Sequence, residues 1–247
     1  MTDVVPVSAA RIPSTLHSTI SGMESLTQDD FITPRWSIVQ PTSKKDGADD
    51  HAGQFLRNLD GEFRPFLECV ILKVSPSRLK WPADIAVGRP ECFSRDGVHG
   101  SVYGACRTCG FNVFANPQLM AKVKAKTVRN GEKCNSGFDY LIIDDLELQT
   151  VALMGAMGTS VAPVRIMNSR FNSLRCPPRA ALTRFSLKRV VNDQGKFYVL
   201  EPVIVRRLTA EERVPWDEMF NIYNNANVVD IETTTDDVSD VDEPLPF

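Results

Sequence analysis

The chain has 247 residues, 43% of them hydrophobic, and a formal net charge of −3. This size allows a buried core in one enlarged domain or in one domain with an insertion, and we expect the second. No run of 18 apolar residues occurs and the first residues lack the features of a signal peptide, which argues against a membrane partner and predicts a cytoplasmic protein.

The charge is distributed unevenly along the chain. Residues 230–247 carry seven acidic residues and no Lys or Arg, so residues 1–229 have a formal net charge of +4. Two segments, 73–133 and 165–213, each hold eleven Lys or Arg against four Asp or Glu. A basic body with an acidic tail predicts contact with a polyanion, and the tail is expected near that surface when the polyanion is absent.

The first part of the chain has few regular elements. Residues 1–30 contain many Ser and Thr with weak periodicity, so we expect a loosely ordered arm with one short helix near 23–30. Residues 36–40 have strand character, and a polar loop follows at 42–50. The apolar and β-branched residues 66–74 predict the first firm strand.

Residues 78–137 differ from the rest of the chain. They are rich in Gly, Pro, Cys and basic residues and have little periodicity, although 118–127 fits a short helix or strand. A segment this long without regular elements is usually disordered or held by a metal ion. We therefore predict a metal-binding insertion here.

Regular elements return after the insertion. Residues 138–143 and 148–154 predict strands, and residues 161–174 predict a helix with Ser160 as its N-cap. Two further strands, at 182–191 and 196–208, form a predicted hairpin around Asn192-Asp193-Gln194-Gly195, and a last helix begins at Thr209.

These elements predict a mostly β fold with minor α content. The strand order suits an OB-type barrel core, although a generic antiparallel sheet would give much the same pattern. We expect an arm at 1–30, an OB-like DNA-binding domain at 31–226 with a zinc-binding insertion lobe at 78–137, and a disordered acidic tail at 227–247.

Four of the six cysteines, Cys92, Cys106, Cys109 and Cys134, fall inside the insertion. In a reducing compartment they suit metal binding better than disulfides. Cys106-Arg107-Thr108-Cys109-Gly110 has the form of a zinc knuckle, and Cys92 and Cys134 complete the four thiolates of a closed tetrahedral site. The sequence predicts a structural Zn²⁺ site, with His99 as the substitute if one of the outer cysteines is not a ligand.

Other roles for the cysteines have less support. A redox Cys-x-x-Cys motif belongs between a strand and a helix of a βαβ unit, which the sequence lacks. A catalytic zinc needs an open position and a nearby acid, and Glu91 and Glu132 fit no deaminase or protease spacing. Cys69 and Cys176 have the apolar or proline-flanked contexts of buried small residues.

Binding of single strands needs cations that follow the phosphates and flat rings on which bases stack. The insertion and the hairpin both interleave aromatic with basic residues. Phe66, Phe138, Phe171 and Phe220 are expected in the core instead. The predicted DNA contacts are Trp36, Arg78, Lys80, Trp81, Phe93, Arg95, Tyr103, Arg107, Lys122, Lys124, Lys126, Arg184, Lys188 and Arg189.

The final residues combine an acidic run with an apolar end, Pro244-Leu245-Pro246-Phe247. Self-repulsion and low apolar content predict disorder before that end. The Phe ring suits capture by an apolar pocket with a basic rim. We expect a protein-docking tip formed by Asp240, Asp242, Glu243, Pro246 and Phe247.

This tail resembles that of bacterial and phage single-stranded DNA-binding proteins. Gly53-Gln54-Phe55 and Trp81-Pro82 are similar to short motifs of phage-encoded members, some of which add a metal lobe to an OB-type core. The resemblance implies a protein without catalytic activity that coats exposed single-stranded DNA in replication, recombination or repair. It also implies recruitment of partner enzymes through the tail tip, in the bacterial host cytoplasm if the protein is phage-encoded.

Two alternative functions stay open. A zinc-lobe nuclease or primase-like enzyme would use Asp139, Asp144, Asp145 and Glu147 as metal-binding carboxylates, although these residues fit a solvated turn better. A zinc-ribbon accessory factor for transcription or recombination would prefer duplex DNA or protein. The oligomeric state does not follow from the sequence.

Overall fold

The computed structural model describes residues 32–41, 50–83, 90–129, 131–192 and 195–225. The predicted arm at 1–30, with its short helix, lies outside the described residues, as does most of the polar loop at 42–50. The predicted tail at 227–247, including Asp240, Asp242, Glu243, Pro246 and Phe247, also lies outside them.

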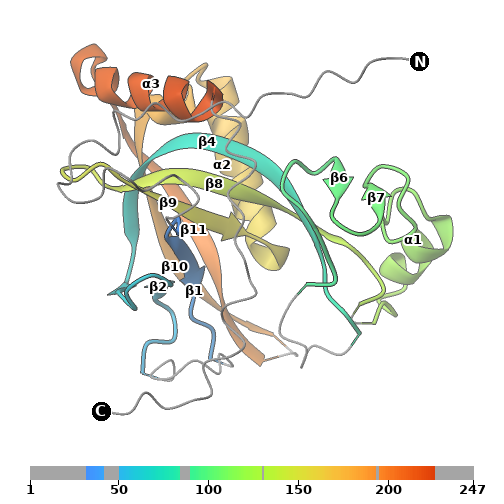
Figure 1. The fold of residues 1–247 in the computed structure, drawn as a ribbon. Helices are drawn as coiled ribbons and strands as arrows, with labels where there is room; N and C mark the ends of the chain where they lie inside the picture. Colours follow the sequence, from blue (N-terminus) through green and yellow to red (C-terminus); the bar gives the residue numbers. More distant parts are fainter. Residues whose placement is uncertain (1–31, 42–49, 84–89, 130, 193–194, 226–247) are drawn as a thin grey trace, which may run out of the picture.

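The described part of the chain is mostly β with minor α content, as the sequence predicts, and it contains three α-helices (Figure 1). The strands are β1 (Arg35–Ile38), β2 (Phe55–Arg57), β3 (Phe63–Arg64), β4 (Leu67–Lys80), β5 (Cys92–Ser94), β6 (His99–Gly100), β7 (Gly104–Ala105), β8 (Asn135–Asp145), β9 (Thr150–Ala156), β10 (Ala181–Asn192) and β11 (Gly195–Arg207). The helices are α1 (Pro117–Lys124), α2 (Val161–Ser173) and α3 (Ala210–Asn225), with 3₁₀ turns at Gly158–Ser160 and Pro178–Ala180.

One curled sheet of nine strands forms the body, in the order β11-β10-β4-β8-β9-β1-β2-β3, with β5 also paired to β4. Neighbouring strands are antiparallel except for β1 and β9, where Arg35 pairs with Leu153 in parallel register. Figure 1 shows β4 and β8 arching together from the body toward the small lobe that carries α1, β6 and β7. The lobe is therefore an extension of two central strands.

The sheet is buried on both faces near its centre. On one face, Tyr140 and Ile142 of β8 pack with Met167 and Phe171 of α2. On the other face, Leu141 and Ile143 pack against Trp216 and Met219 of α3. Because side chains alternate along a strand, a strand covered on both faces is apolar throughout, which explains the run Tyr140-Leu141-Ile142-Ile143.

The two long helices begin in different ways. The predicted N-cap Ser160 makes no side-chain cap to α2, because its hydroxyl accepts a hydrogen bond from Leu200 N of β11 (3.1 Å). At the start of α3, Thr209 Oγ1 accepts from Glu212 N (3.2 Å) and Thr209 N donates to Glu212 Oε2 (2.8 Å). This reciprocal pair is a capping box, and it fixes where α3 leaves β11.

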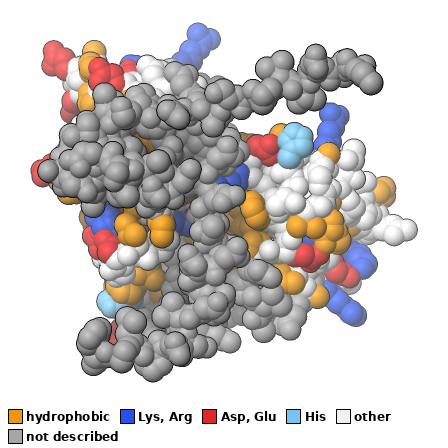
Figure 2. Space-filling model, in the orientation of Figure 1, with side chains coloured by type: hydrophobic (Ala, Val, Ile, Leu, Met, Phe, Trp, Pro, Cys, Tyr) orange, Lys and Arg blue, Asp and Glu red, His pale blue; other side chains and the backbone are white. Residues whose placement is uncertain are grey.

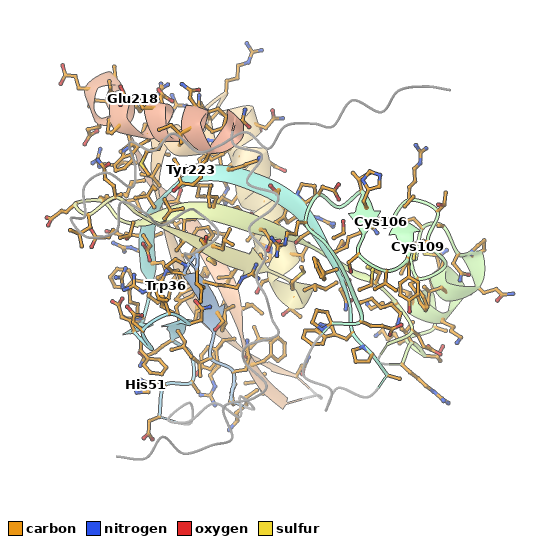
Figure 3. All side chains as sticks on the ribbon, viewed as in Figure 1. Trp36, His51, Cys106, Cys109, Glu218 and Tyr223 are labelled. Carbon is orange, nitrogen blue, oxygen red and sulfur yellow. The ribbon has the colours of Figure 1, made fainter. Side chains whose placement is uncertain are left out.

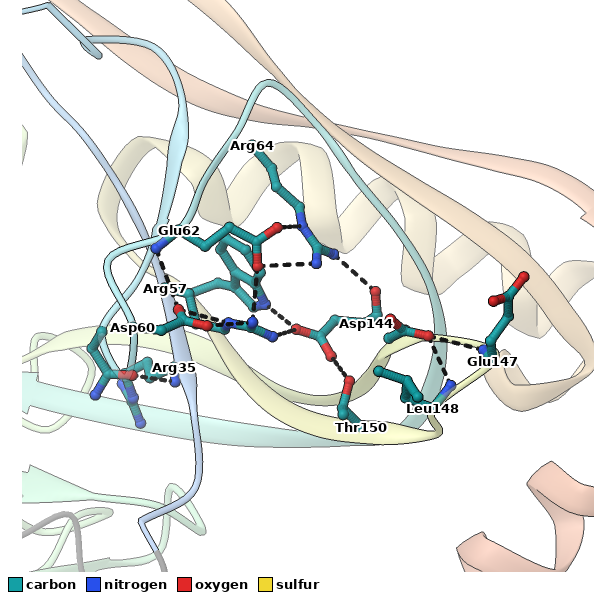
Figure 4. A network of polar contacts seen from close by, with 12 residues as sticks. Arg35, Arg57, Asp60, Glu62, Arg64, Asp144, Glu147, Leu148 and Thr150 are labelled. Atoms are coloured by element: carbon teal, nitrogen blue, oxygen red, sulfur yellow. Dashed lines mark hydrogen bonds and ion pairs between the residues drawn. The ribbon is translucent and has the colours of Figure 1, made fainter.

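A buried carboxylate joins the ends of several strands (Figure 4). Asp144 Oδ2 accepts from Trp36 Nε1 (2.7 Å) and Arg57 Nη1 (3.3 Å), and Asp144 Oδ1 accepts from Thr150 Oγ1 (2.6 Å). The Arg57 and Arg64 guanidiniums lie over the Trp36 ring, at 5.4 and 4.9 Å from its centroid. Residues of β1, β2, β3, β8 and β9 are thereby held together.

Replacing Asp144 with Ala should destabilise the protein by about 3–5 kcal/mol, because the buried Trp36 N–H and the Thr150 hydroxyl lose their acceptor and Arg57 loses one of its three carboxylate partners. The free energy of unfolding from urea titration measures this. The matched control is Asp60→Asn, because Asp60 also pairs with Arg57 but is 44% exposed, and its loss should cost no more than about 1 kcal/mol. Equal effects of the two changes would contradict the role given to Asp144.

Candidate metal centre and nucleic-acid interface

The far end of β4 organises the lobe. β5 pairs with one edge of β4, placing Cys92 opposite Lys80, and β8 pairs with the other edge, placing Asn135 opposite Leu79. Cys134, immediately before Asn135, therefore reaches the same end of β4 as Cys92. Two cysteines that are distant in sequence are brought together by strand register.

The other two cysteines are held by a hydrogen-bonded turn around Asn112. Its side-chain Nδ2 donates to Cys106 O (2.9 Å), and its backbone N donates to Cys109 O (2.9 Å). Cys134 N donates to Phe111 O (2.8 Å), which ties this turn to the start of β8. Figure 3 shows Cys106 and Cys109 in the lobe, apart from Trp36 and Tyr223 in the body.

All four predicted metal ligands line one cavity in the lobe. Its volume is about 10 Å³, the space of about one water-sized sphere, and Arg78 and Lys80 of β4 also line it. A Cβ added at Gly100 would lie 2.9 Å from Cys92 Sγ and 3.8 Å from Cys106 Sγ. Glycine at this position therefore leaves room for the two sulfur atoms.

Four thiols around one small cavity are a donor set that suits zinc. Among the residues that the structure describes, however, no group of three or more His, Cys, Asp or Glu is arranged so that it could hold a metal ion. Zinc therefore stays a prediction. His99 does not line the cavity; it is exposed, with Nδ1 3.2 Å from Asp96 Oδ2, so its substitution for a cysteine has no support here.

The pKa of the Cys134 thiol is raised to about 11, chiefly by burial; Arg78 opposes this rise, and the neighbouring thiols of Cys92, Cys106 and Cys109 contribute to it. Without a metal ion, this thiol keeps its proton at neutral pH. Binding of a metal ion would displace that proton, since thiolates are the metal ligands. Cys69, by contrast, is fully buried in β4, which raises the pKa of its thiol far above the ordinary value.

Two of the predicted DNA contacts are wrong because their side chains are buried. Trp36 is 2% exposed and its indole N–H donates a hydrogen bond to Asp144, so its ring is not available for stacking on a base. Lys80 is 4% exposed, pairs with Glu91, and has Nζ 4.2 Å from the centroid of the Phe111 ring. Both residues lie in polar stretches of the sequence, which favoured an exposed position. Their partners come from other segments of the chain, and a local pattern does not indicate them. Phe66, expected in the core, is instead 44% exposed beneath Arg184.

The other predicted contacts fall into two groups at opposite ends of β4. Arg184 pairs with Glu68 near the start of β4, and Lys188 and Arg189 continue outward along β10. The lobe group lies beyond the other end and is partly or fully exposed, with basic side chains around the rim of the lobe (Figure 2). It comprises Arg78, Trp81, Phe93, Arg95, Tyr103, Arg107, Lys122, Lys124 and Lys126.

The lobe also exposes a ring that the predicted contact set lacks. Phe114 is 85% exposed, the highest value among the large hydrophobic residues described, and Phe93 is 40% exposed. Phe114 projects because Asn112 Oδ1 accepts from Phe114 N (3.1 Å) and Asn112 O accepts from Ala115 N (3.0 Å), which makes a tight turn before α1. The polar residues around this Phe are the signal that could have identified it.

A polar cluster links the lobe to the adjoining sheet. The Arg95 guanidinium lies 5.7 Å from the centroid of the Phe93 ring. Burial raises the pKa of Asp139, while Arg35, Ser77 and Arg95 lower it. A Cβ added at Gly155 would lie 3.3 Å from Asp139 Oδ1 and 3.8 Å from Arg35 Nη1, which places these groups around one glycine. Arg35, absent from the predicted set, is a partly exposed member of this cluster.

The carboxylates that a nuclease or primase-like enzyme would use do not form a metal-binding site within the described residues. Asp144 is buried and fully engaged, so it is not part of a solvated turn. Asp145 accepts from Glu147 N (2.9 Å) and Leu148 N (2.8 Å) and shapes its own turn. In the described residues these acids do not make a metal-binding group.

Protein purified without added metal should contain close to one zinc ion per chain by mass spectrometry, since four thiols surround one cavity. Cys109→Ser should lower that content sharply. Cys176→Ala is the control, because Cys176 is a buried cysteine outside the lobe, and its zinc content should stay unchanged. Zinc-free wild-type protein would remove the predicted site.

Comparisons with known proteins do not assign a function to this site. No protein-family model, no curated protein and no solved structure matches the chain. Among the described helices, none is both long enough and apolar enough to cross a membrane. The inference of function therefore depends on the side chains of the lobe and the adjoining sheet.

Proposed function

We propose that the protein binds single-stranded DNA without sequence preference, using the lobe and the adjoining sheet as its binding surface. The observation that carries this proposal is the exposure of Phe93 and Phe114 among basic side chains of the lobe. Rings exposed to water contribute nothing to a core, whereas they can stack on bases. In this proposal, Arg35, Arg95 and Arg107 bind the phosphates.

The curled antiparallel sheet supports an OB-type core for this surface, in which strands present a concave face to nucleic acid. In the lobe, Cys92, Cys106, Cys109 and Cys134 would hold a structural zinc ion. The ion and four thiolates would carry a formal charge of −2, which Arg78 at the same cavity would partly offset, whereas the charge of Lys80 is paired with Glu91. Lys80 thus supports the lobe without touching DNA.

The acidic tail completes the proposal as a docking segment. Its Pro-Phe tip would recruit replication or recombination enzymes, and its acids would compete for the basic surface when DNA is absent. Binding of DNA then frees the tail for its partners.

The double change Phe93→Ala and Phe114→Ala should lower affinity for oligo-dT at least tenfold, because each stacked base contributes about 1–3 kcal/mol. Fluorescence anisotropy of labelled oligo-dT across a salt series measures this. Leu148→Ala is the matched control, since Leu148 is 76% exposed at the distant turn between β8 and β9. An equal loss in the control, or no binding by wild-type protein, would refute the proposed surface.

Asp139→Asn should raise affinity for oligo-dT, because it removes a negative charge between Arg35 and Arg95. Since the pKa of Asp139 is raised, wild-type protein should also bind more tightly as the pH is lowered toward that pKa and the carboxyl gains its proton. The Asn variant should lose this part of the pH dependence. Identical pH profiles for the two proteins would contradict the placement of Asp139 beside bound phosphates.

A further inference from the structure

A second cavity lies beside the C-terminal half of α2 and has a volume of about 580 Å³. Its apolar lining comes from Val74, Phe171, Pro177 and Pro178, and its polar lining includes Asn168, Asn172 and Arg175. Cavities of this size accommodate small organic ligands. The cavity shares no lining residue with the cysteine cavity of the lobe.

The polar groups of this second cavity suit a ligand that has both an anionic group and a ring with hydrogen-bonding groups at its edge. Asn168 and Asn172 are one helical turn apart, and each amide offers both donors and an acceptor. Asn168 Oδ1 accepts from Tyr140 Oη (3.3 Å), which orients its amide. The described lining contains a guanidinium, from Arg175, and no Asp or Glu. A guanidinium fork matches the oxygens of a phosphate.

Arg175 occupies a backbone conformation that favours glycine. Its φ is +47°, and it follows α2 in a Schellman motif, in which Arg175 N donates to Asn172 O and Cys176 N donates to Phe171 O, both at 3.0 Å. Glycine is the usual residue at this position, because a Cβ is unfavourable there. Lys126 and Gln149 share this conformation, but among these three residues only Arg175 lines the second cavity, which makes its side chain the candidate ligand group there.

The negative end of α2 does not prevent binding of a phosphate here. The carbonyls of Phe171 and Asn172 are occupied by the Schellman motif, and Leu174 O accepts from Arg207 Nη2 (3.1 Å). The last turn of α2 therefore presents few free carbonyl oxygens to an anion. Arg207 adds a second cation at this helix end.

The position of the cavity along β4 connects it to the proposed DNA surface. Val74 lines the second cavity and Arg78 lines the cysteine cavity. These residues are four apart on one strand, so they lie on the same face, about 13 Å from each other. A nucleic-acid strand on the lobe could therefore place one of its nucleotides in the second cavity.

We propose that the second cavity is a nucleotide subsite. The base lies against Pro177 and Pro178, the amides of Asn168 and Asn172 bind its polar edge, and Arg175 binds a phosphate. The nucleotide is either one unit of a bound strand or a free mononucleotide. The inference rests on the proposed function only if the nucleotide is one unit of a bound strand.

The test uses the full-length chain and substitutions of Arg175. Arg175→Ala should weaken binding at least tenfold for dAMP if free nucleotide is the ligand, measured by calorimetry. If Arg175→Ala instead weakens binding of labelled oligo-dA and oligo-dT at least tenfold, measured by anisotropy, and leaves dAMP binding unchanged, the ligand is one nucleotide of a bound strand. Arg165→Ala is the matched control, because Arg165 is an exposed arginine of α2 outside the cavity, and it should change neither affinity.

Arg175→Gly separates a binding role from a structural one. It should raise the urea midpoint of unfolding, because glycine relieves the strained φ, and yet weaken nucleotide binding as much as Arg175→Ala. Unchanged binding of both ligands in the Arg175 variants would overturn the subsite, while the loss caused by Phe93→Ala with Phe114→Ala would still support the proposed function. If wild-type protein binds no oligonucleotide, the proposed function fails and dAMP binding alone decides the subsite.

Discussion

The pairing of β4 with three other strands is the constraint on which the rest of the structure depends. Its first residues pair with β10, its middle and end with β8, and its last three residues also with β5. The first half is buried between α2 and α3, and the second half leaves the core to support the lobe. Body and lobe are therefore joined by the hydrogen-bonded ladder of β4 and β8, which has one register shift between Ile71 and Lys73.

The same strand determines the chemistry of the lobe. Arg78 and Lys80 place two cations at the cavity where four thiols meet, and Lys80 is kept there by Glu91 and the Phe111 ring. An uncompensated cluster of thiolates would be costly to bury, as would an isolated ammonium group. The outer surface of the lobe exposes Phe93, Phe114 and several basic residues.

Local sequence patterns predicted the helices and strands that have a regular apolar spacing or a recognisable turn. The burial of individual side chains depended on contacts with residues elsewhere in the chain. The run Tyr140–Ile143, the hairpin closed at Gly195 with φ +119°, and the helix from Val161 all follow from periodicity or turn chemistry. Cysteine spacing predicted a zinc site; the four cysteines do line one cavity, and the zinc ion itself stays a prediction. The burial of Trp36 did not follow, because its acceptor Asp144 is 108 residues away. Lys80 was misjudged because its partners, Glu91 and the Phe111 ring, come from a segment without periodicity, and β2 and β3 are too short to leave a periodic signal.

The three tryptophans occupy distinct environments, and this gives the protein an internal optical reporter. Trp36 and Trp216 are 2% and 7% exposed in the body, whereas Trp81 is partly exposed where β4 enters the lobe. Trp36 is also flanked by two guanidiniums. Emission at long wavelengths therefore originates chiefly from Trp81, and a soluble quencher such as iodide would sample events at the junction while the two core indoles supply a steady background.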